Sequence, residues 1–216
     1  NIGLGKCALQ SLNEGDNNVA IGCLAGQDLT SGLGNVFMGQ GAGCNITTAG
    51  DNIFIGRMPG ATSTASCMNI VMGFEAGNAG TLASKYNTFI GMQAGCKNTD
   101  GCYNTLLGYQ AGTNLTTGGS NILIGKKAGS NAAITGSRNI FIGEYAGDNT
   151  TSGQDNIGLG YLTLASATLV GGYNVAFGRE AGRKYAGSNG CNVYIGKTAG
   201  CGGTGTVDGV NNIMLG

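Results

Sequence analysis

The residues of this 216-residue chain that are best suited to chemistry are its eight cysteines. No two of them have the Cys-x-x-Cys spacing of a zinc site, and the chain contains no histidine that could complete one. An even number of cysteines is typical of proteins from oxidising compartments, where thiols pair as disulfides. These residues therefore indicate cross-linking, and the candidates are Cys7, Cys23, Cys44, Cys67, Cys96, Cys102, Cys191 and Cys201.

Acid–base catalysis has few candidate residues. Histidine, the commonest general base, is absent, and the eleven acidic residues are scattered. Glycoside cleavage needs two neighbouring carboxylates, but Glu75, Glu144 and Glu180 are far apart. The glycine-rich turns lack both the Lys-Ser/Thr of a phosphate-binding loop and the Gly-Gly-x-Gly-x-Asp of a calcium-binding roll. We expect no enzyme, no cofactor and no metal.

The composition points to short strands joined by tight turns. Glycine accounts for 44 residues and proline for one, while 41% of the residues are hydrophobic, too many for a disordered chain. The glycines do not recur at every third position, which excludes collagen. Eleven basic and eleven acidic residues cancel, and no stretch of 18 apolar residues occurs. The sequence therefore predicts neither nucleic-acid binding nor membrane insertion.

One five-residue pattern, Asn-β-branched-x-apolar-Gly, recurs along the whole chain. Successive copies are 17 or 18 residues apart, except the last, which follows after 20. Such a period is the signature of a solenoid in which each repeat forms one coil. The asparagines, which we number position 0 of each coil, are Asn1, Asn18, Asn35, Asn52, Asn69, Asn87, Asn104, Asn121, Asn139, Asn156, Asn174, Asn192 and Asn212.

The middle of each repeat reads as a strand. Positions +1 and +3 are β-branched and apolar, and we expect them to share one buried face. Position +2 would then point outward, where an apolar column needs a cover. Identical chains are the economical cover, so we predict a homotrimer, with a dimer as the alternative. The predicted interface consists of Phe37, Phe54, Val71, Phe89, Leu106, Leu123, Phe141 and Tyr194.

The ends of the strand read as turns. The recurring Gly at +4 marks a positive φ or a close approach between coils. The recurring Asn suits a ladder of side-chain amides along the stack. Apolar residues at +11 between polar neighbours suggest a second, shorter strand, which makes the coil a flattened roll. Representative turn residues are Asn18, Gly22, Asn35, Gly39, Asn52, Gly56, Asn121 and Gly125.

The motifs Asn18-Val-Ala-Ile-Gly22 and Asn174-Val-Ala-Phe-Gly178 resemble the head repeats of trimeric autotransporter adhesins. The segments Asn87-Thr-Phe-Ile-Gly-Met-Gln-Ala-Gly95 and Asn104-Thr-Leu-Leu-Gly-Tyr-Gln-Ala-Gly112 look similar to repeats of phage tail fibres. The resemblance extends over essentially all 216 residues and implies left-handed parallel β-rolls that assemble as trimers. Coils of 17–18 residues are longer than those of the adhesin heads.

Two other functions compete with a fibre. Ile21-Gly22-x-x-Ala25-Gly26 fits the hexapeptide of left-handed β-helix acyltransferases, but it occurs once per coil instead of about three times, and the histidine of those enzymes is missing. An ice-binding face is the second alternative, because threonine recurs at +12, although +10 and +14 are not regularly threonine. The +12 threonines are Thr30, Thr47, Thr64, Thr81, Thr99, Thr116, Thr151, Thr168 and Thr204.

The cysteines and three sequons recur at related phases of the repeat. Cys7 and Cys23 lie on adjacent coils at nearly the same phase, and three similar bridges are Cys44–Cys67, Cys96–Cys102 and Cys191–Cys201. Buried free thiols are the alternative. Three Asn-x-Thr sequons are candidate glycosylation sites in a glycosylating host. Alternatively, they arise by accident, because the repeat favours a polar residue at +10 and threonine at +12. Their asparagines are Asn45, Asn114 and Asn149.

Taken together, these features predict an all-β parallel β-solenoid of about 12 coils, with residues 1–216 as a single repeat domain and a fragment of a longer fibre. We expect a structural or adhesive segment of a virion tail fibre or cell-surface filament, extracellular and self-associating. The variable positions +5 and +6 are candidates for binding a receptor or glycan. Alternatively, they form a solvated edge whose charges prevent aggregation. These carry Lys6, Arg57, Tyr109, Lys126, Lys127, Tyr145, Tyr161, Arg179 and Lys197.

Overall fold

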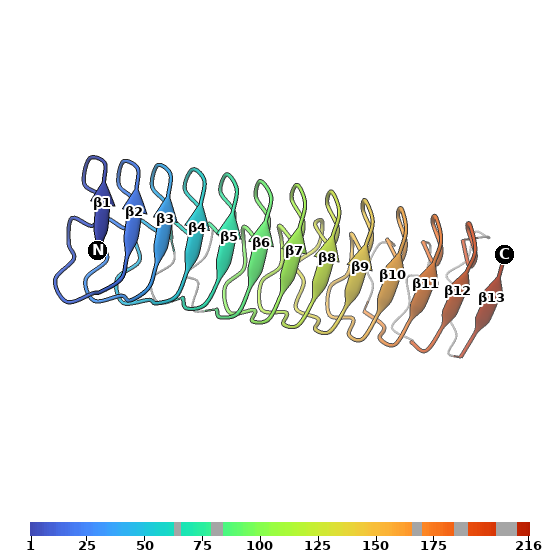
Figure 1. Ribbon diagram of the computed structural model, residues 1–216. Helices are drawn as coiled ribbons and strands as arrows, with labels where there is room; N and C mark the ends of the chain where they lie inside the picture. Colours follow the sequence, from blue (N-terminus) through green and yellow to red (C-terminus); the bar gives the residue numbers. More distant parts are fainter. Residues whose placement is uncertain (63–65, 79–83, 166–169, 184–189, 202–210) are drawn as a thin grey trace.

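The computed structural model describes residues 1–62, 66–78, 84–165, 170–183, 190–201 and 211–216. The described residues contain no helix, and each strand has three residues. Figure 1 shows the strands side by side in one row, with the chain ends at opposite ends of the row. The strands are β1 (Ile2–Leu4), β2 (Val19–Ile21), β3 (Val36–Met38), β4 (Ile53–Ile55), β5 (Ile70–Met72), β6 (Thr88–Ile90), β7 (Thr105–Leu107), β8 (Ile122–Ile124), β9 (Ile140–Ile142), β10 (Ile157–Leu159), β11 (Val175–Phe177), β12 (Val193–Ile195) and β13 (Ile213–Leu215).

All thirteen strands form one sheet whose spatial order is the order of the sequence. Every pairing is parallel and keeps the same register, so that Phe37 lies beside Phe54 as Ala20 lies beside Phe37. The chain therefore returns to the same phase after each repeat, one strand spacing further along (Figure 1). This arrangement is a parallel β-solenoid, as the sequence predicts.

The far side of the coil is less regular than predicted. The described residues form no second strand there, but only two isolated parallel bridges, Cys67 to Lys85 and Leu115 to Ile134. The apolar residues at +11 do point inward where predicted, because Leu29, Ile46 and Leu115 are fully buried. The far side therefore supplies core side chains through turns instead of through a second ladder.

The predicted assignment of the strand faces is wrong. From Ala20 to Tyr194 the side chains at +2 are buried inside the single chain, at 0–1% exposure, and form the core of the coil. Buried side chains cannot form an interface with another chain. The predicted interface is therefore wrong at every residue named for it: Phe37, Phe54, Val71, Phe89, Leu106, Leu123, Phe141 and Tyr194. The residues at +1 and +3 face outward instead.

The asparagine at position 0 decides which strand face is inside. Its side chain points into the coil, because its amide Nδ2 donates to a carbonyl on the far side of the same coil, as Asn121 does to Gly136 at 3.0 Å. Side chains of a strand alternate between its two faces, so positions 0 and +2 share the interior while +1 and +3 share the exterior. With +1, +2 and +3 almost all apolar, hydrophobicity alone does not reveal this choice.

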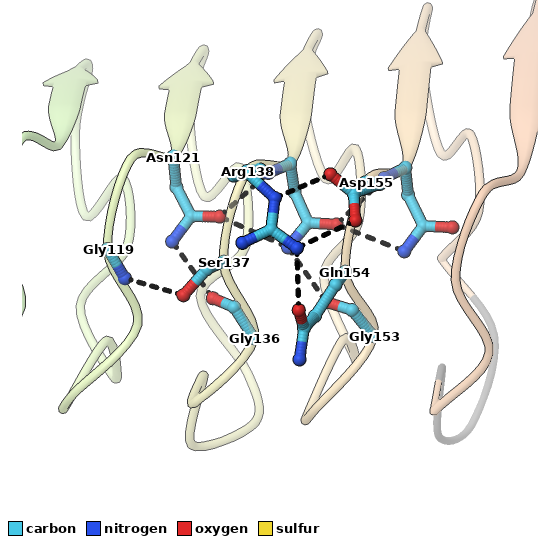
Figure 2. Close-up of polar contacts among 10 residues, drawn as sticks. Gly119, Asn121, Gly136, Ser137, Arg138, Gly153, Gln154 and Asp155 are labelled. Carbon is cyan, nitrogen blue, oxygen red and sulfur yellow. Dashed lines mark hydrogen bonds and ion pairs between the residues drawn. The ribbon is translucent and has the colours of Figure 1, made fainter.

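The predicted asparagine ladder is present and buried. The Asn121 carbonyl oxygen Oδ1 accepts hydrogen bonds from the backbone N–H and the Nδ2 of Asn139, at 3.0 and 3.1 Å. Asn139 in turn accepts the same two bonds from Asn156, at 3.1 and 3.0 Å. Figure 2 shows this chain of amides running from coil to coil. Each amide therefore satisfies buried backbone groups of its own coil and of the next coil.

The glycines at +4 are required by the stacking of the coils. From Gly5 to Gly196 their φ angles lie between 119° and 140°, a region that is essentially restricted to glycine. A Cβ on Gly22 would lie 2.5 Å from the carbonyl oxygen of Gly39, the equivalent residue of the next coil. The predicted turn role of these residues is confirmed, with both a positive φ and a close approach.

Positions +2 and +8 of each coil are matched in size. Where +2 is large, +8 is glycine, because a Cβ on Gly43 would lie 2.7 Å from the Phe37 ring. Where +2 is glycine, as at Gly158, the space is filled by Leu164, which is fully buried. The first coil shows the same exchange, with Gly3 and Leu9. Where both positions are small, as in Ala20 with Gly26, side chains of the neighbouring coils approach instead: a Cβ on Gly26 would lie 2.7 Å from Phe37 and 3.0 Å from Leu9.

This match predicts how the coil of β10 responds to substitution. Gly158→Phe alone overfills the coil, because an added Cβ already lies 3.0 Å from the Thr163 hydroxyl and 3.1 Å from the Phe141 ring, and we expect it to lower the free energy of unfolding by about 1–3 kcal/mol. Adding Thr163→Ala and Leu164→Gly restores the combination found in most coils and should recover most of the loss. Urea unfolding followed by circular dichroism measures both. A triple variant no more stable than Gly158→Phe would contradict the size match.

Candidate functional site

The outward face of the sheet is a continuous apolar surface. We define it as positions +1 and +3 of β1 to β13, none of which carries a charged residue. In the inner strands none of these side chains is buried, and several are well exposed, for example 37% for Ile53, 39% for Ile142 and 45% for Ile195. A continuous exposed apolar surface of this kind is unusual in a monomeric soluble protein and marks an interaction site.

Two rows of more polar residues border the outward face. The start rim consists of the residue before each strand's asparagine, and the end rim of the residue after each strand's closing glycine. The start rim comprises Asn17, Gly34, Asp51, Met68, Tyr86, Tyr103, Ser120, Arg138, Asp155, Tyr173, Cys191 and Asn211. The end rim comprises Lys6, Cys23, Gln40, Arg57, Phe74, Met92, Tyr109, Lys126, Glu144, Tyr161, Arg179 and Lys197.

On each rim, an ion pair joins neighbouring coils. Arg138 donates from Nε to Asp155 at 2.7 Å and from a terminal nitrogen to Asp155 and Gln154, both at 2.8 Å (Figure 2). These hydrogen bonds hold the pKa of the Asp155 carboxyl below its ordinary value. On the end rim, Lys126 pairs with Glu144 at 2.8 Å, and the hydrogen bond to Glu144 raises the pKa of Lys126.

Aromatic residues stack along the rims as well. The rings of Tyr86 and Tyr103 lie nearly parallel, with centroids 4.9 Å apart. The Arg57 guanidinium lies 4.2 Å from the Phe74 ring centroid, and Tyr145 packs edge-on against Tyr161. The sequence prediction singled out the residues of positions +5 and +6, and the structure places them together along one edge. The aromatic start rim was not singled out, although Tyr86 and Tyr103 follow the period of the repeat.

None of the predicted disulfides is present. All eight cysteines lie in the described part of the chain, and none is bonded to another. Cys44 lies at position +9 and Cys67 at position +15, which are different corners of the coil. Two of the thiols bond to backbone groups instead: Cys44 donates to the Ala61 carbonyl at 3.6 Å, and Cys102 to the Asp100 carbonyl at 3.4 Å. Burial raises the pKa of the Cys44 thiol.

Two of the three sequon asparagines and several of the threonines donate hydrogen bonds to the neighbouring coil. Asn45 is exposed, whereas Asn114 donates to the Ser130 carbonyl at 2.6 Å and Asn149 to the Ala165 carbonyl at 3.4 Å. A glycan on either of the latter two would replace one of the two hydrogens of the Nδ2 that makes that bond. Among the threonines, Thr30, Thr99 and Thr116 donate their hydroxyl protons to carbonyls of the next coil, at 3.0, 3.2 and 3.3 Å. Outside the described residues lie Thr64, Thr81, Thr168 and Thr204.

The three glutamates considered for catalysis lie on one edge but have separate partners. Glu75 accepts from Gln93 at 3.0 Å, Glu144 pairs with Lys126, and Glu180 pairs with Arg183 at 2.9 Å. They belong to the coils of β5, β9 and β11, so that they are separated by roughly 19 and 10 Å along the stack. These separations exceed those of glycosidase carboxylate pairs.

No pocket and no group of three or more metal-ligating side chains is found among the described residues. The same part of the chain has no helix able to cross a membrane. Comparison with family models, curated proteins and solved structures finds no match to the chain. The outward face and its two rims are therefore the candidate functional site.

Proposed function

We propose that this chain is a rigid structural segment of a fibre on the surface of a virion or cell. The observation that carries the proposal is the unbroken stack of thirteen parallel strands in sequence order. Each coil contacts only its neighbours, so a chain of this design extends in length without changing its cross-section. At about 4.8 Å per step, the stack spans roughly 58 Å.

The proposed fibre is homo-oligomeric, with three left-handed coils side by side as the resemblance to adhesin heads and tail fibres implies. It would hold a receptor-binding tip away from a surface, or contact a receptor or glycan along its edge. The exposed apolar sheet supports self-association, because such a surface is seldom left in contact with water. Ice binding is supported less well, since threonine hydroxyls donate to carbonyls of the stack.

Immunogold electron microscopy of the source organism or virion tests the proposed location. Antibodies raised against the purified chain are expected to decorate filaments on intact particles or cells, because a surface fibre is accessible without opening them. Antibodies depleted on the purified chain provide the control. Labelling that occurs only after the particles or cells are opened would overturn the proposal.

A further inference from the structure

We propose that the outward face is the surface through which copies of this chain assemble, parallel and in register, around an axis that runs along the rod. The inference rests on the proposed homo-oligomeric fibre and adds which residues meet. The residues that meet are the exposed side chains at +1 and +3, and not the side chains at +2 that the sequence predicts, which are buried.

The area of the outward face is sufficient for a stable assembly. Twelve strand steps of ~4.8 Å give a length of about 58 Å, and the width from start rim to end rim is six residues at ~3.3 Å, or about 20 Å. The product is about 1,100 Å² per copy, compared with roughly 800 Å² per partner in a standard stable interface. An apolar centre between two polar rims is also the usual anatomy of an interface.

The symmetry axis determines which rims meet. Rotation about an axis along the rod leaves every coil at its own height. A two-fold rotation reverses the direction of the facing strands, and a three-fold rotation turns it by one third of a full turn. The start rim of one copy then lies against the end rim of its neighbour, coil by coil. This holds for two copies and for three, because in both cases the axis is parallel to the rod.

The two rims are complementary when they are compared at the same coil. At the height of β4 an acid faces a base, Asp51 and Arg57, and at β9 a base faces an acid, Arg138 and Glu144. At the height of β7 two tyrosines face each other, Tyr103 and Tyr109. At no height does a charged residue face one of the same sign. Each pair stands at opposite ends of one strand, roughly 20 Å apart within a chain.

An antiparallel pair fits less well. An axis across the middle of the rod reverses the order of the coils, so that the coil of β4 lies opposite the coil of β10. The start rims then face each other, which brings Asp51 toward Asp155 of the other copy. Like charges placed together in this way oppose association. The parallel arrangement avoids this conflict and pairs Asp51 with Arg57 instead.

The contribution of the apolar face is tested by one substitution. Ile142→Glu places a charge on the outward face at a residue already 39% exposed, so the coil can still fold. We expect its mass in sedimentation equilibrium to fall to that of one chain, with an unchanged circular dichroism spectrum. Thr117→Glu, on an exposed residue of the far side, is the matched control and should leave the mass unchanged.

The register is tested by exchanging the charges of one pair. No ion pair joins Asp51 and Arg57 within the described chain, so any rescue must arise between copies. Asp51→Arg and Arg57→Asp are each expected to weaken association at least ten-fold, because each brings like charges together. The double variant restores an acid–base pair and should recover most of the affinity.

The outcomes separate this inference from the proposed function. A wild-type chain that stays monomeric at tens of micromolar overturns both the interface and the homo-oligomeric fibre. An oligomer whose mass survives Ile142→Glu overturns the interface and leaves the fibre standing. An oligomer that is lost in Ile142→Glu, but whose charge exchange gives no recovery, overturns the parallel in-register arrangement.

Discussion

Asn121→Asp is expected to lower the free energy of unfolding by about 3–5 kcal/mol at pH 7. The substitution preserves the shape of the side chain, but it removes the amide that donates to the Gly136 carbonyl at 3.0 Å. The position is fully buried, so a carboxylate there would face that carbonyl oxygen without water. Urea unfolding followed by circular dichroism measures the loss.

The same variant should regain stability in acid. Burial raises the pKa of the introduced carboxyl in the folded state above its value of about 3.9 in the unfolded chain. Between these two pKa values the unfolded state binds fewer protons than the folded state, so stability falls as the pH rises. Below about pH 4 the protonated carboxyl donates to the Gly136 carbonyl, and the difference from the wild type should shrink.

Asn17→Asp is the matched control for this experiment. Asn17 precedes a ladder asparagine but is exposed, and its φ of 59° is tolerated by both Asn and Asp. We expect its stability to stay within about 0.5 kcal/mol of the wild type. Equal losses in the two variants would show that the ladder amide contributes no more than an ordinary surface residue.

Gly125→Ala is the second substitution with a large expected effect. The φ of Gly125 is 128°, and an added Cβ would lie 2.6 Å from the carbonyl oxygen of Gly143 and 2.7 Å from its carbon. Neither neighbour can move aside, because both belong to the backbone of the next coil. The backbone conformation alone costs about 1–3 kcal/mol, and the contact adds to it. We expect a loss of at least about 3 kcal/mol, measured by urea unfolding.

Gly41→Asn tests whether any glycine with a positive φ is equally sensitive. Its φ is 65°, and an added Cβ would meet only the flexible Met58 side chain, at 3.3 Å. Other coils carry larger residues at this position with similar φ, for example Leu24 at 62°. We expect a change within about 1 kcal/mol. A loss as large as that of Gly125→Ala would mean that positive φ, and not the approach of the coils, explains the +4 column.

Several features of the fold follow from the sequence alone. The period of the Asn–Gly pattern predicts a strand at the same place in every repeat, parallel stacking and the phase of every coil, because a constant repeat length returns the chain to the same point. The second strand predicted around +11 is not formed in the described residues. The turn roles of Asn18 and Gly22 follow from their recurrence combined with backbone chemistry. These are local or periodic properties, and they do not depend on which way a side chain points.

The period of the repeat does not predict which cysteines form disulfides. Phase along the repeat gives a position on the coil to within a few residues, whereas a disulfide requires two Cα atoms within about 7 Å and converging side chains. Cys44 and Cys67 recur at regular phases, yet these phases belong to different corners of the coil. Distance in the repeat is therefore a poor substitute for distance in space.

The sequence determined the solenoid, and the tertiary structure decided which face of it is inside. Apart from Thr88 and Thr105 at +1, positions +1, +2 and +3 carry no polar side chain except the Tyr194 hydroxyl, so the hydrophobic pattern fits either choice. The choice is made by a hydrogen bond across the coil, from the position 0 amide of Asn121 to Gly136, which turns +2 inward by alternation. Only folding brings these two groups together, and with them it creates the exposed apolar face and its paired rims.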